Sequence, residues 1–311
     1  MTSFELAQKD GFNAALRTLG GTEKKLVKAY MAAKVKIAQR VVDEGGKLTL
    51  AWAQSMYSQI NAEIQKIIIA RTRIITWGHA EIYKGAYYSQ LYGVEQQVNL
   101  YNVPGIKDTH WTVNAPLLRG RAVEAALQTK IGGVAFLERN ALERTIMQQT
   151  TREAVTTAIA AGDSPRDLAR DLEDLLDIST ARATRVARTE LLRAYSFGQD
   201  EADKISESAG VAMNYKWSST LDSRTRRDHR EMDQKKAEII NGEVIFTLPD
   251  GTKGAFPRDV TLSAKESVNC RCRRVAVVSG FTPSTRAAKV EGKWTKVGMI
   301  SYPEWQASLK L

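Results

Sequence analysis

The sequence contains few of the features that mark secreted or membrane proteins. Its 311 residues include only two cysteines, Cys270 and Cys272, and cysteines one residue apart make a strained disulfide. The first ten residues lack the apolar segment that a secretory signal requires. The longest apolar patch, residues 67–70, is far shorter than the roughly 20 residues of a membrane span. We therefore expect synthesis in a reducing cytoplasm and no membrane partner.

Sequence motifs of the common enzyme classes are also missing. No glycine-rich phosphate loop follows a predicted strand, and no nucleophile elbow occurs. There is also no carboxylate-rich nuclease motif. The sequence therefore predicts a protein that is not an enzyme.

The bulk composition is that of a folded, basic protein. Hydrophobic residues make up 43% and charged residues 26% of the chain, the formal net charge is +10, and the pI is about 9.5. The length suits one large or two ordinary domains. The excess of positive charge favours contact with a polyanion, first of all nucleic acid. The alternative interpretation is a basic protein that has no polyanionic partner.

The first two thirds of the chain have helical periodicity. Apolar residues recur every three to four positions, and Thr22 suits the start and Gly45 the end of the first predicted helix. A break rich in proline and glycine is expected at residues 99–116. The predicted helices cover residues 22–44, 48–77, 80–91, 117–161, 166–175 and 179–207.

The last third predicts a small antiparallel sheet with a helix across it. Strands are expected at residues 212–217, 244–248 and 268–278, with a turn at Pro249–Gly251. A helix is expected at residues 225–236, with Asp222 or Ser223 as its N-cap. Residues 279–311 predict an extended or hooked arm with aromatic anchors. The expected fold class is α+β, a helical N-terminal region followed by helices packed on the small sheet.

Cys270 and Cys272 would project to one face of the last predicted strand. Together with His229 they offer one imidazole and two thiolates, a set that zinc accepts, with Asp222 or Asp228 as a fourth ligand. An open fourth position would suit a metal-dependent nuclease or hydrolase. The other interpretation is a hydrogen-bonded cluster in which Asp222 pairs with a nearby arginine, Arg224 or Arg226, and the cysteines are small buried hydrophobes.

Basic side chains around this region predict a surface that follows a phosphate backbone without reading sequence. Interleaved carboxylates also permit a solvated charged surface with no DNA. The candidate DNA-binding residues are Arg224, Arg227, Arg230, Lys235, Lys236, Arg271, Arg273 and Arg274.

An ordered set of motifs resembles the phage Mu protein F-like minor head proteins, also called phage head morphogenesis proteins. The set consists of Arg188-Thr189-Glu190, Trp217, Asp222 with Thr225-Arg226, His229, and Asn269-Cys-Arg-Cys272. The resemblance covers roughly residues 148–278. One departure follows His229, where the family tends to have Asp-Gly and this chain has Asp233-Gln234.

The resemblance implies domains at residues 1–147 (helical), 148–278 (head morphogenesis) and 279–311 (arm). It also implies a minor capsid protein of a tailed bacteriophage, located in the capsid interior or at the portal vertex. The implied partners are the portal protein, the major capsid protein and non-specifically bound dsDNA, with a role in procapsid assembly and in DNA packaging or ejection.

Within this family, Arg188 and Glu190 would clamp helix to sheet together with Arg226. A scaffold-like or toxin-carrier module is a third interpretation of the chain. We expect it less because no effector domain follows Val278.

Overall fold

The computed structural model describes residues 3–101, 120–130, 133–281 and 284–309. The chain forms two compact units, one of residues 1–18, 79–126 and 189–311, the other of residues 19–78 and 127–188. Helices α1 (Ser3–Asp43), α2 (Leu50–Tyr101) and α6 (Pro165–Ser208) contribute to both units. We call them the sheet unit and the helical unit. The predicted domain boundaries at residues 147 and 278 remain predictions.

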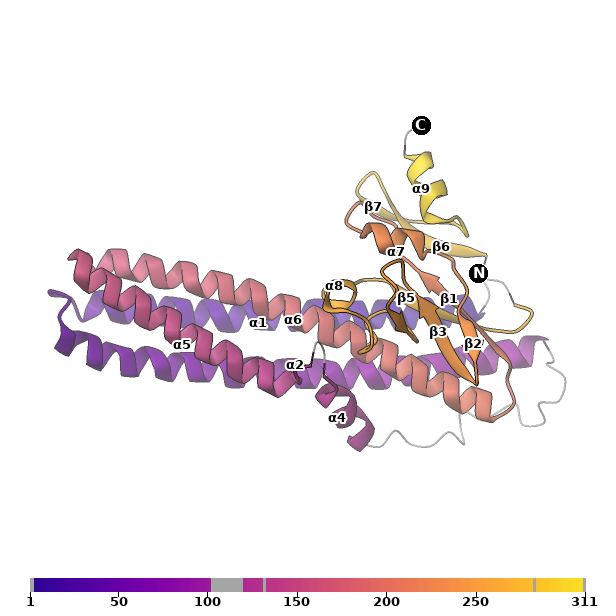
Figure 1. Ribbon diagram of the computed structural model, residues 1–311, viewed down its shortest axis with the longest axis horizontal. Helices are drawn as coiled ribbons and strands as arrows, with labels where there is room; N and C mark the ends of the chain where they lie inside the picture. The colour runs from indigo at the N-terminus through magenta and orange to yellow at the C-terminus, as the bar shows by residue number, and fades with distance from the viewer. Residues whose placement is uncertain (1–2, 102–119, 131–132, 282–283, 310–311) are drawn as a thin grey trace. The chain divides into compact units, whose positions relative to one another are not determined.

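The helical unit is built from segments of α1, α2, α5 (Phe136–Ala161) and α6, which lie alongside one another in Figure 1. Its core is formed by the apolar stripes expected from helical periodicity. Gly45 and Gly46 have φ values of 52° and 78°, so glycine suits the end of α1. Buried residues of this core include Tyr30, Ile37, Ile60, Ile64, Met147, Val155, Leu168, Leu172 and Ala183.

Two helices are longer than the sequence predicted. Helix α1 begins at Ser3, so Thr22 is a buried residue within a helix and not its N-cap. Helix α6 runs without a break through residues 176–178, where two helices were predicted. Leu172, Leu176 and Ala183 are all buried, and their helical spacing carries one apolar stripe through the expected break.

The predicted helix at residues 117–161 is divided into α4 (Gly120–Gln128) and α5. Leu137 and Leu142, which lie within the predicted helix, are exposed, whereas Phe136 and Met147 are buried. Residues 99–101 of the expected break belong to α2, which ends at Tyr101, and residues 102–116 lie outside the described residues.

The sheet unit contains short antiparallel sheets in place of the single sheet predicted. Strand β1 (Met213–Ser218) pairs with β5 (Arg273–Val278). Strands β2 (Glu238–Ile240), β3 (Glu243–Thr247) and β4 (Lys253–Gly254) form a separate three-stranded sheet.

Two tight turns connect the strands of the three-stranded sheet. Asn241 and Gly242 link β2 to β3 with φ values of 52° and 80°, the geometry of a two-residue hairpin turn. The predicted turn at Pro249–Gly251 is confirmed, since the amide of Gly251 donates to the carbonyl of Leu248 at 2.9 Å.

The core of the sheet unit packs both sheets against helices α2 and α6. Trp217 of β1 is fully buried, and its ring meets that of Phe246 on β3 edge to face at 5.5 Å. Cys270 and Cys272 belong to the same cluster. Other members are Tyr87, Leu91, Val94, Val98, Ala202, Met213, Tyr215, Met232 and Ala276.

Residues 284–309 form a hairpin and a helix, where an extended or hooked arm with aromatic anchors was predicted. Strands β6 (Thr285–Val290) and β7 (Lys293–Gly298) form a hairpin, followed by helix α9 (Tyr302–Ser308). Tyr302 and Trp305 pack with Leu221 and Ala288 in a small core. Trp305 is therefore an anchor within its own chain, whereas Trp294 is exposed.

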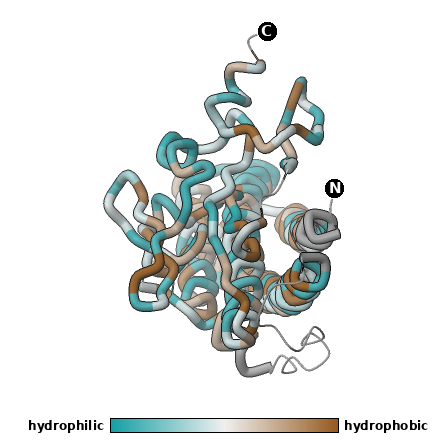
Figure 2. Tube along the Cα trace, turned by 90° about the vertical axis from the view of Figure 1, so that its right-hand side faces the viewer, coloured by the Kyte–Doolittle hydropathy of each residue, from teal (hydrophilic) through white to brown (hydrophobic). Residues whose placement is uncertain are grey.

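The α+β fold class is confirmed, because helices α1, α2, α4, α5 and α6 are followed by the small antiparallel sheets. Figure 2 shows hydrophobic and hydrophilic residues intermixed along the traced chain. Among the described residues, no helix has the length and apolar character needed to cross a membrane.

Candidate metal centre

His229 lies on a helix much shorter than predicted. Helix α7 covers only Arg227–Glu231, and the chain then turns back beside β1. The amide of Gln234 donates to the carbonyl of Trp217 at 2.8 Å. Gln234 has a φ of 63°, a value that favours glycine. The chain therefore keeps, with a glutamine, the left-handed turn for which the resembling family tends to have Asp-Gly.

The cysteines lie in a loop and not in the strand that was predicted. Helix α8 (Ala264–Ser267) precedes them, and β5 begins only at Arg273. Asn269, just before Cys270, has a φ of 58°. The alternation of a strand therefore does not explain why the two thiols face the same way. The folding of this loop brings both of them to His229.

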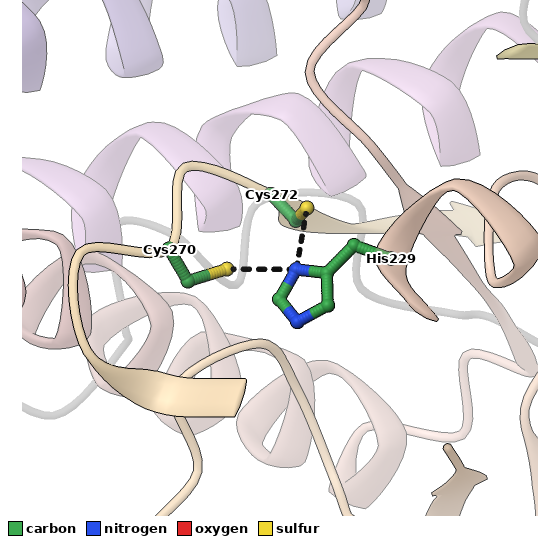
Figure 3. Close-up of side chains that lie close together, drawn as sticks. All are labelled: His229, Cys270 and Cys272. Carbon is green, nitrogen blue, oxygen red and sulfur yellow. Dashed lines mark hydrogen bonds between the residues drawn. The ribbon is translucent and has the colours of Figure 1, made fainter. Parts of the chain in front are cut away.

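The imidazole of His229 meets both thiols through one nitrogen (Figure 3). Its Nδ1 atom lies 3.3 Å from Sγ of Cys272 and 3.5 Å from Sγ of Cys270. The three ligand atoms all lie within 4.8 Å of one another, and the three residues are buried. This group can hold a metal ion.

The second nitrogen of His229 and its ring also have defined contacts. Nε2 of His229 lies 2.7 Å from Oε2 of Glu266 on α8, a carboxylate that is fully buried. The indole of Trp217 meets the imidazole edge to face, with centroids 5.5 Å apart. Sequence reasoning missed Glu266, because nothing local sets it apart from other glutamates.

The protonation of the three side chains is shifted by their contacts. Burial lowers the pKa of His229, but its hydrogen bond to Cys270 and the charges of Cys270 and Glu266 outweigh this and raise it. Burial raises the pKa of the Cys272 thiol. For Cys270, hydrogen bonds to Cys272 and His229 and the Arg258 charge overcome burial and lower the thiol pKa. One thiol therefore ionises more readily than the other.

A buried arginine holds the cysteine loop in place. Nη1 of Arg258 donates to the carbonyls of Cys270 and Cys272 at 3.1 and 2.6 Å, and Nη2 donates to Oγ of Ser196 on α6 at 2.8 Å. Arg258 is 1% exposed and has a φ of 70°. Its role was not predicted, since it depends on contacts across the fold.

The two aspartates considered as fourth ligands have other partners. Asp222 forms a two-pronged ion pair with Arg271, with Nη2 2.8 Å from Oδ1, and also accepts from the amide of Arg224. Asp228 pairs with Lys265 at 2.6 Å. In the described part of the chain, the metal-ligating group consists of the histidine and the two cysteines.

The Arg-Thr-Glu motif touches the cysteine loop through its central residue. Oγ1 of Thr189 accepts a hydrogen bond from the amide of Asn269 at 2.9 Å. Arg188 pairs with Glu23 at 2.6 Å, and the buried Glu190 pairs with Arg193 at 2.8 Å. A clamp through Arg188 and Glu190 remains a prediction.

Arg226, the third predicted clamp residue, reaches the same loop from α7. Its guanidinium donates to the carbonyls of Glu266 and Val268. The motifs of residues 188–190, 226 and 269–272 therefore meet around one loop, which carries both thiols.

The candidate DNA-binding residues fall into two groups. Three of them have partners within the chain. Arg271 pairs with Asp222, and Arg273 lies over the ring of Phe12. Arg274 pairs with Asp200 and Asp203. Arg230 donates to the carbonyls of Thr225 and Ser223. The exposed members are Arg224, Arg227, Lys235 and Lys236.

Comparison with known proteins shows that this region is similar to a phage family. Residues 149–275 match the family model described as Phage Mu protein F like protein. The matched segment contains the histidine, both cysteines, Glu266 and Arg258. No solved structure gives a significant match.

Three relatives match the chain. It is 33% identical over 158 residues to the minor head protein GP7 of Bacillus phage SPP1, which covers 50% of each protein. It is 26% identical over 253 residues to the NAD(+)–arginine ADP-ribosyltransferase EFV of Enterococcus faecalis, which covers 81% of this chain and 48% of the relative. It is 34% identical over 152 residues to the uncharacterized protein YqbB of Bacillus subtilis, covering 45% and 48%.

The chain spans about half the length of the curated relatives that it matches. The family match nevertheless agrees with the motif set in the sequence and with the loop around which those motifs meet. Residues 149–275 of this chain are thus similar to the Phage Mu protein F-like family.

Proposed function

We propose that the chain is a minor head protein of a tailed bacteriophage, present in the virion and active in head morphogenesis. The observation that carries this proposal is the family match over residues 149–275, together with the similarity to a protein named minor head protein. The architecture supports the same role. The polar side chains of the family motifs bind one another and backbone carbonyls inside the fold, as in a structural protein.

We propose the portal protein as the principal partner, with the major capsid protein and dsDNA as further contacts. The support for DNA is the net charge of +10 and the exposed residues Arg224, Arg227, Lys235 and Lys236. Binding would follow the phosphate backbone without base specificity. A location in the capsid interior or at the portal vertex, and a part in DNA packaging or ejection, belong to the same proposal.

The relative named as an ADP-ribosyltransferase raises the alternative of an enzyme. That match covers 48% of the relative, so the relative's name describes a longer protein than the region that matches. The chain is also similar to the minor head protein of phage SPP1, so similarity to the ADP-ribosyltransferase alone does not assign a transferase activity to it. We therefore propose that this chain is not an enzyme.

The alternative of a nuclease or hydrolase centred on the cluster has less support. His229 and Cys272 are 2% exposed and Cys270 is 3% exposed. A phosphodiester or peptide substrate could not reach them without opening of the fold. Any metal held there, zinc first of all, would have a structural role in the proposed head protein.

An assembly reaction tests the proposal. The portal, coat and scaffolding proteins of the phage that encodes this chain would be co-expressed with it, and procapsids separated by sedimentation. We expect the chain to sediment with procapsids in few copies, and to be missing from shells assembled without portal protein. A chain that stays at the top of the gradient in both cases would contradict the proposal.

A further inference from the structure

We propose that His229, Cys270 and Cys272 bind one Zn²⁺ ion through Nδ1 and the two Sγ atoms, and that Glu266 positions the histidine for this ion. The inference deepens the structural role proposed for the cluster in the head protein. The metal would join α7 to the loop between α8 and β5.

The two nitrogen–sulfur distances within the cluster fit a zinc site. With Zn–S bonds of about 2.3 Å and Zn–N bonds of about 2.0–2.1 Å, tetrahedral geometry places ligand nitrogen and sulfur about 3.5 Å apart. The Nδ1–Sγ distances here are 3.3 and 3.5 Å. Figure 3 shows both sulfurs directed toward the same nitrogen. Three side chains from two segments of the chain therefore converge at ligand separations without the ion.

Hydrogen bonds among the three side chains can form in the metal-free protein, and a bound metal ion would replace them. A neutral imidazole with its proton on Nε2 has a single lone pair on Nδ1, and can accept a hydrogen bond from one thiol. Two thiols lie within reach of that one atom. A metal ion satisfies all three atoms at once, because each donates an electron pair to the same centre.

Glu266 supplies the second feature of a metal site. A histidine that binds a metal through one nitrogen usually donates its other N–H to a carboxylate, which fixes the tautomer and the ring orientation. Nε2 of His229 lies 2.7 Å from Oε2 of Glu266, whose side chain is fully buried. This contact leaves the lone pair of Nδ1 directed at the sulfurs. Glu266 is a positioning residue.

Arg258 completes the charge balance of the buried site. Two thiolates neutralise Zn²⁺, and the guanidinium of Arg258, 3.8 Å from Sγ of Cys270, offsets the carboxylate of Glu266. Binding releases the thiol protons that remain. The soft donor set of two thiolates and one imidazole selects zinc over magnesium or calcium.

The test is titration of the full-length, metal-free protein with Co²⁺, followed by competition with Zn²⁺. The chain contains only two cysteines, so a thiolate-to-cobalt charge-transfer band reports on this site alone. We expect the band to saturate at one Co²⁺ per chain, to disappear when Zn²⁺ is added, and to be lost in Cys270→Ser and Cys272→Ser. Absence of the band in the folded wild-type protein would overturn the proposal.

Two further measurements keep the test decisive if the cysteine variants do not fold. Zn²⁺ should raise the Tm of the metal-free wild-type protein, because a ligand that binds only the folded state stabilises it. Glu266→Gln keeps all three ligands and should weaken zinc affinity by about 10–100-fold. Glu231→Gln, on the exposed side of α7, is the matched control and should leave the affinity unchanged. Equal affinities in both variants would remove the assigned role of Glu266.

The metal-binding test and the procapsid test can fail independently of each other. A protein that joins procapsids but binds no Co²⁺ or Zn²⁺ would refute the site and keep the function. A protein that binds zinc but stays outside procapsids would refute the proposed function and keep the zinc site.

Discussion

Arg286 on β6 forms a two-pronged ion pair with Asp233, two residues beyond the end of α7. Nη1 lies 2.7 Å from Oδ2, and Nη2 lies 2.9 Å from Oδ1. Asp233 also accepts from the amides of Ser219 and Tyr302, both at 2.8 Å. The C-terminal hairpin and α9 are thereby tied to the segment that carries His229. This contact explains why residues 279–311 are part of the sheet unit.

Breaking this pair should destabilise the protein strongly. The side chains of Arg286 and Asp233 are 3% and 0% exposed, and a buried ion pair that loses one partner leaves an uncompensated charge. We expect Asp233→Asn to lower the free energy of unfolding by about 3–5 kcal/mol, measured by chemical denaturation. The control is Arg227→Gln, which breaks the exposed pair with Glu231 and should change little. Equal effects of the two variants would show that the Asp233 pair is not structural.

A glycine at position 234 should be accepted without loss of stability. Gln234 has a φ of 63°, where a side chain is strained and glycine is not. We expect Gln234→Gly to leave the free energy of unfolding unchanged or to raise it by up to about 1 kcal/mol. Lys235→Gly, one position on, should lower it by about 0.5–1 kcal/mol. Thermal and chemical denaturation of both variants checks this, and a larger loss for Gln234→Gly would contradict it.

Asp200 and Asp203, which both pair with Arg274, should contribute to the free energy of unfolding with opposite pH dependence. Burial raises the pKa of Asp203 to about 7. A pKa that is higher in the folded than in the unfolded protein stabilises the fold while the carboxyl is protonated. This contribution is fully present below the pKa of the unfolded state and is lost as pH rises through about 7. For Asp200, burial is outweighed by the charge of Arg274 and by Lys204, and the pKa is lowered. Its stability contribution is present at neutral pH and is lost in acid.

Denaturation of Asp203→Asn and Asp200→Asn between pH 3 and 8 separates these contributions. The stability advantage of the wild type over Asp203→Asn should shrink as pH rises from about 4 to 7. Its advantage over Asp200→Asn should shrink as pH falls below the ordinary range of an aspartate. The same trend in both variants would contradict the assignment.

The proposed DNA binding should depend on the exposed basic residues near α7. We expect replacement of Arg224, Arg227, Lys235 and Lys236 by alanine to weaken dsDNA binding about equally for all sequences, and to reduce the salt slope by about 1 per lost phosphate contact. Binding is measured by fluorescence anisotropy at several salt concentrations. The double variant Lys293→Ala/Lys296→Ala on β7, also exposed, should behave like the wild type. Loss of binding in that control, or none in the fourfold variant, would place the interface elsewhere.

The sequence predicted the fold class and the members of the cluster because both depend on signals that are local or strongly patterned. Helical stripes such as Leu26 to Val41 need only a repeat of three to four residues. His229 and the two cysteines belong to the ordered set of motifs that carries the family resemblance, so the sequence could predict that they act together. The reason first given for the cysteines, alternation along a strand, was nevertheless wrong.

The features missed depend on contacts between distant residues. Glu266 and Arg258 act through His229 and the cysteine loop, and no spacing in the sequence distinguishes them from surface residues. The hairpin of β6 and β7 turns at Glu291-Gly292, where Glu291 has a φ of 47°. Glutamate is unusual at that position of a hairpin turn, so the sequence carries little sign of it.

The most direct test of the head-protein account is a count of this chain in purified virions. A phage deleted for the gene would be complemented with the wild-type chain, and its heads analysed by quantitative mass spectrometry against the portal protein. The account predicts that the chain is present in heads at a low and constant ratio to portal, and that heads made without it are fewer or defective. Normal heads that never contain the chain would contradict it.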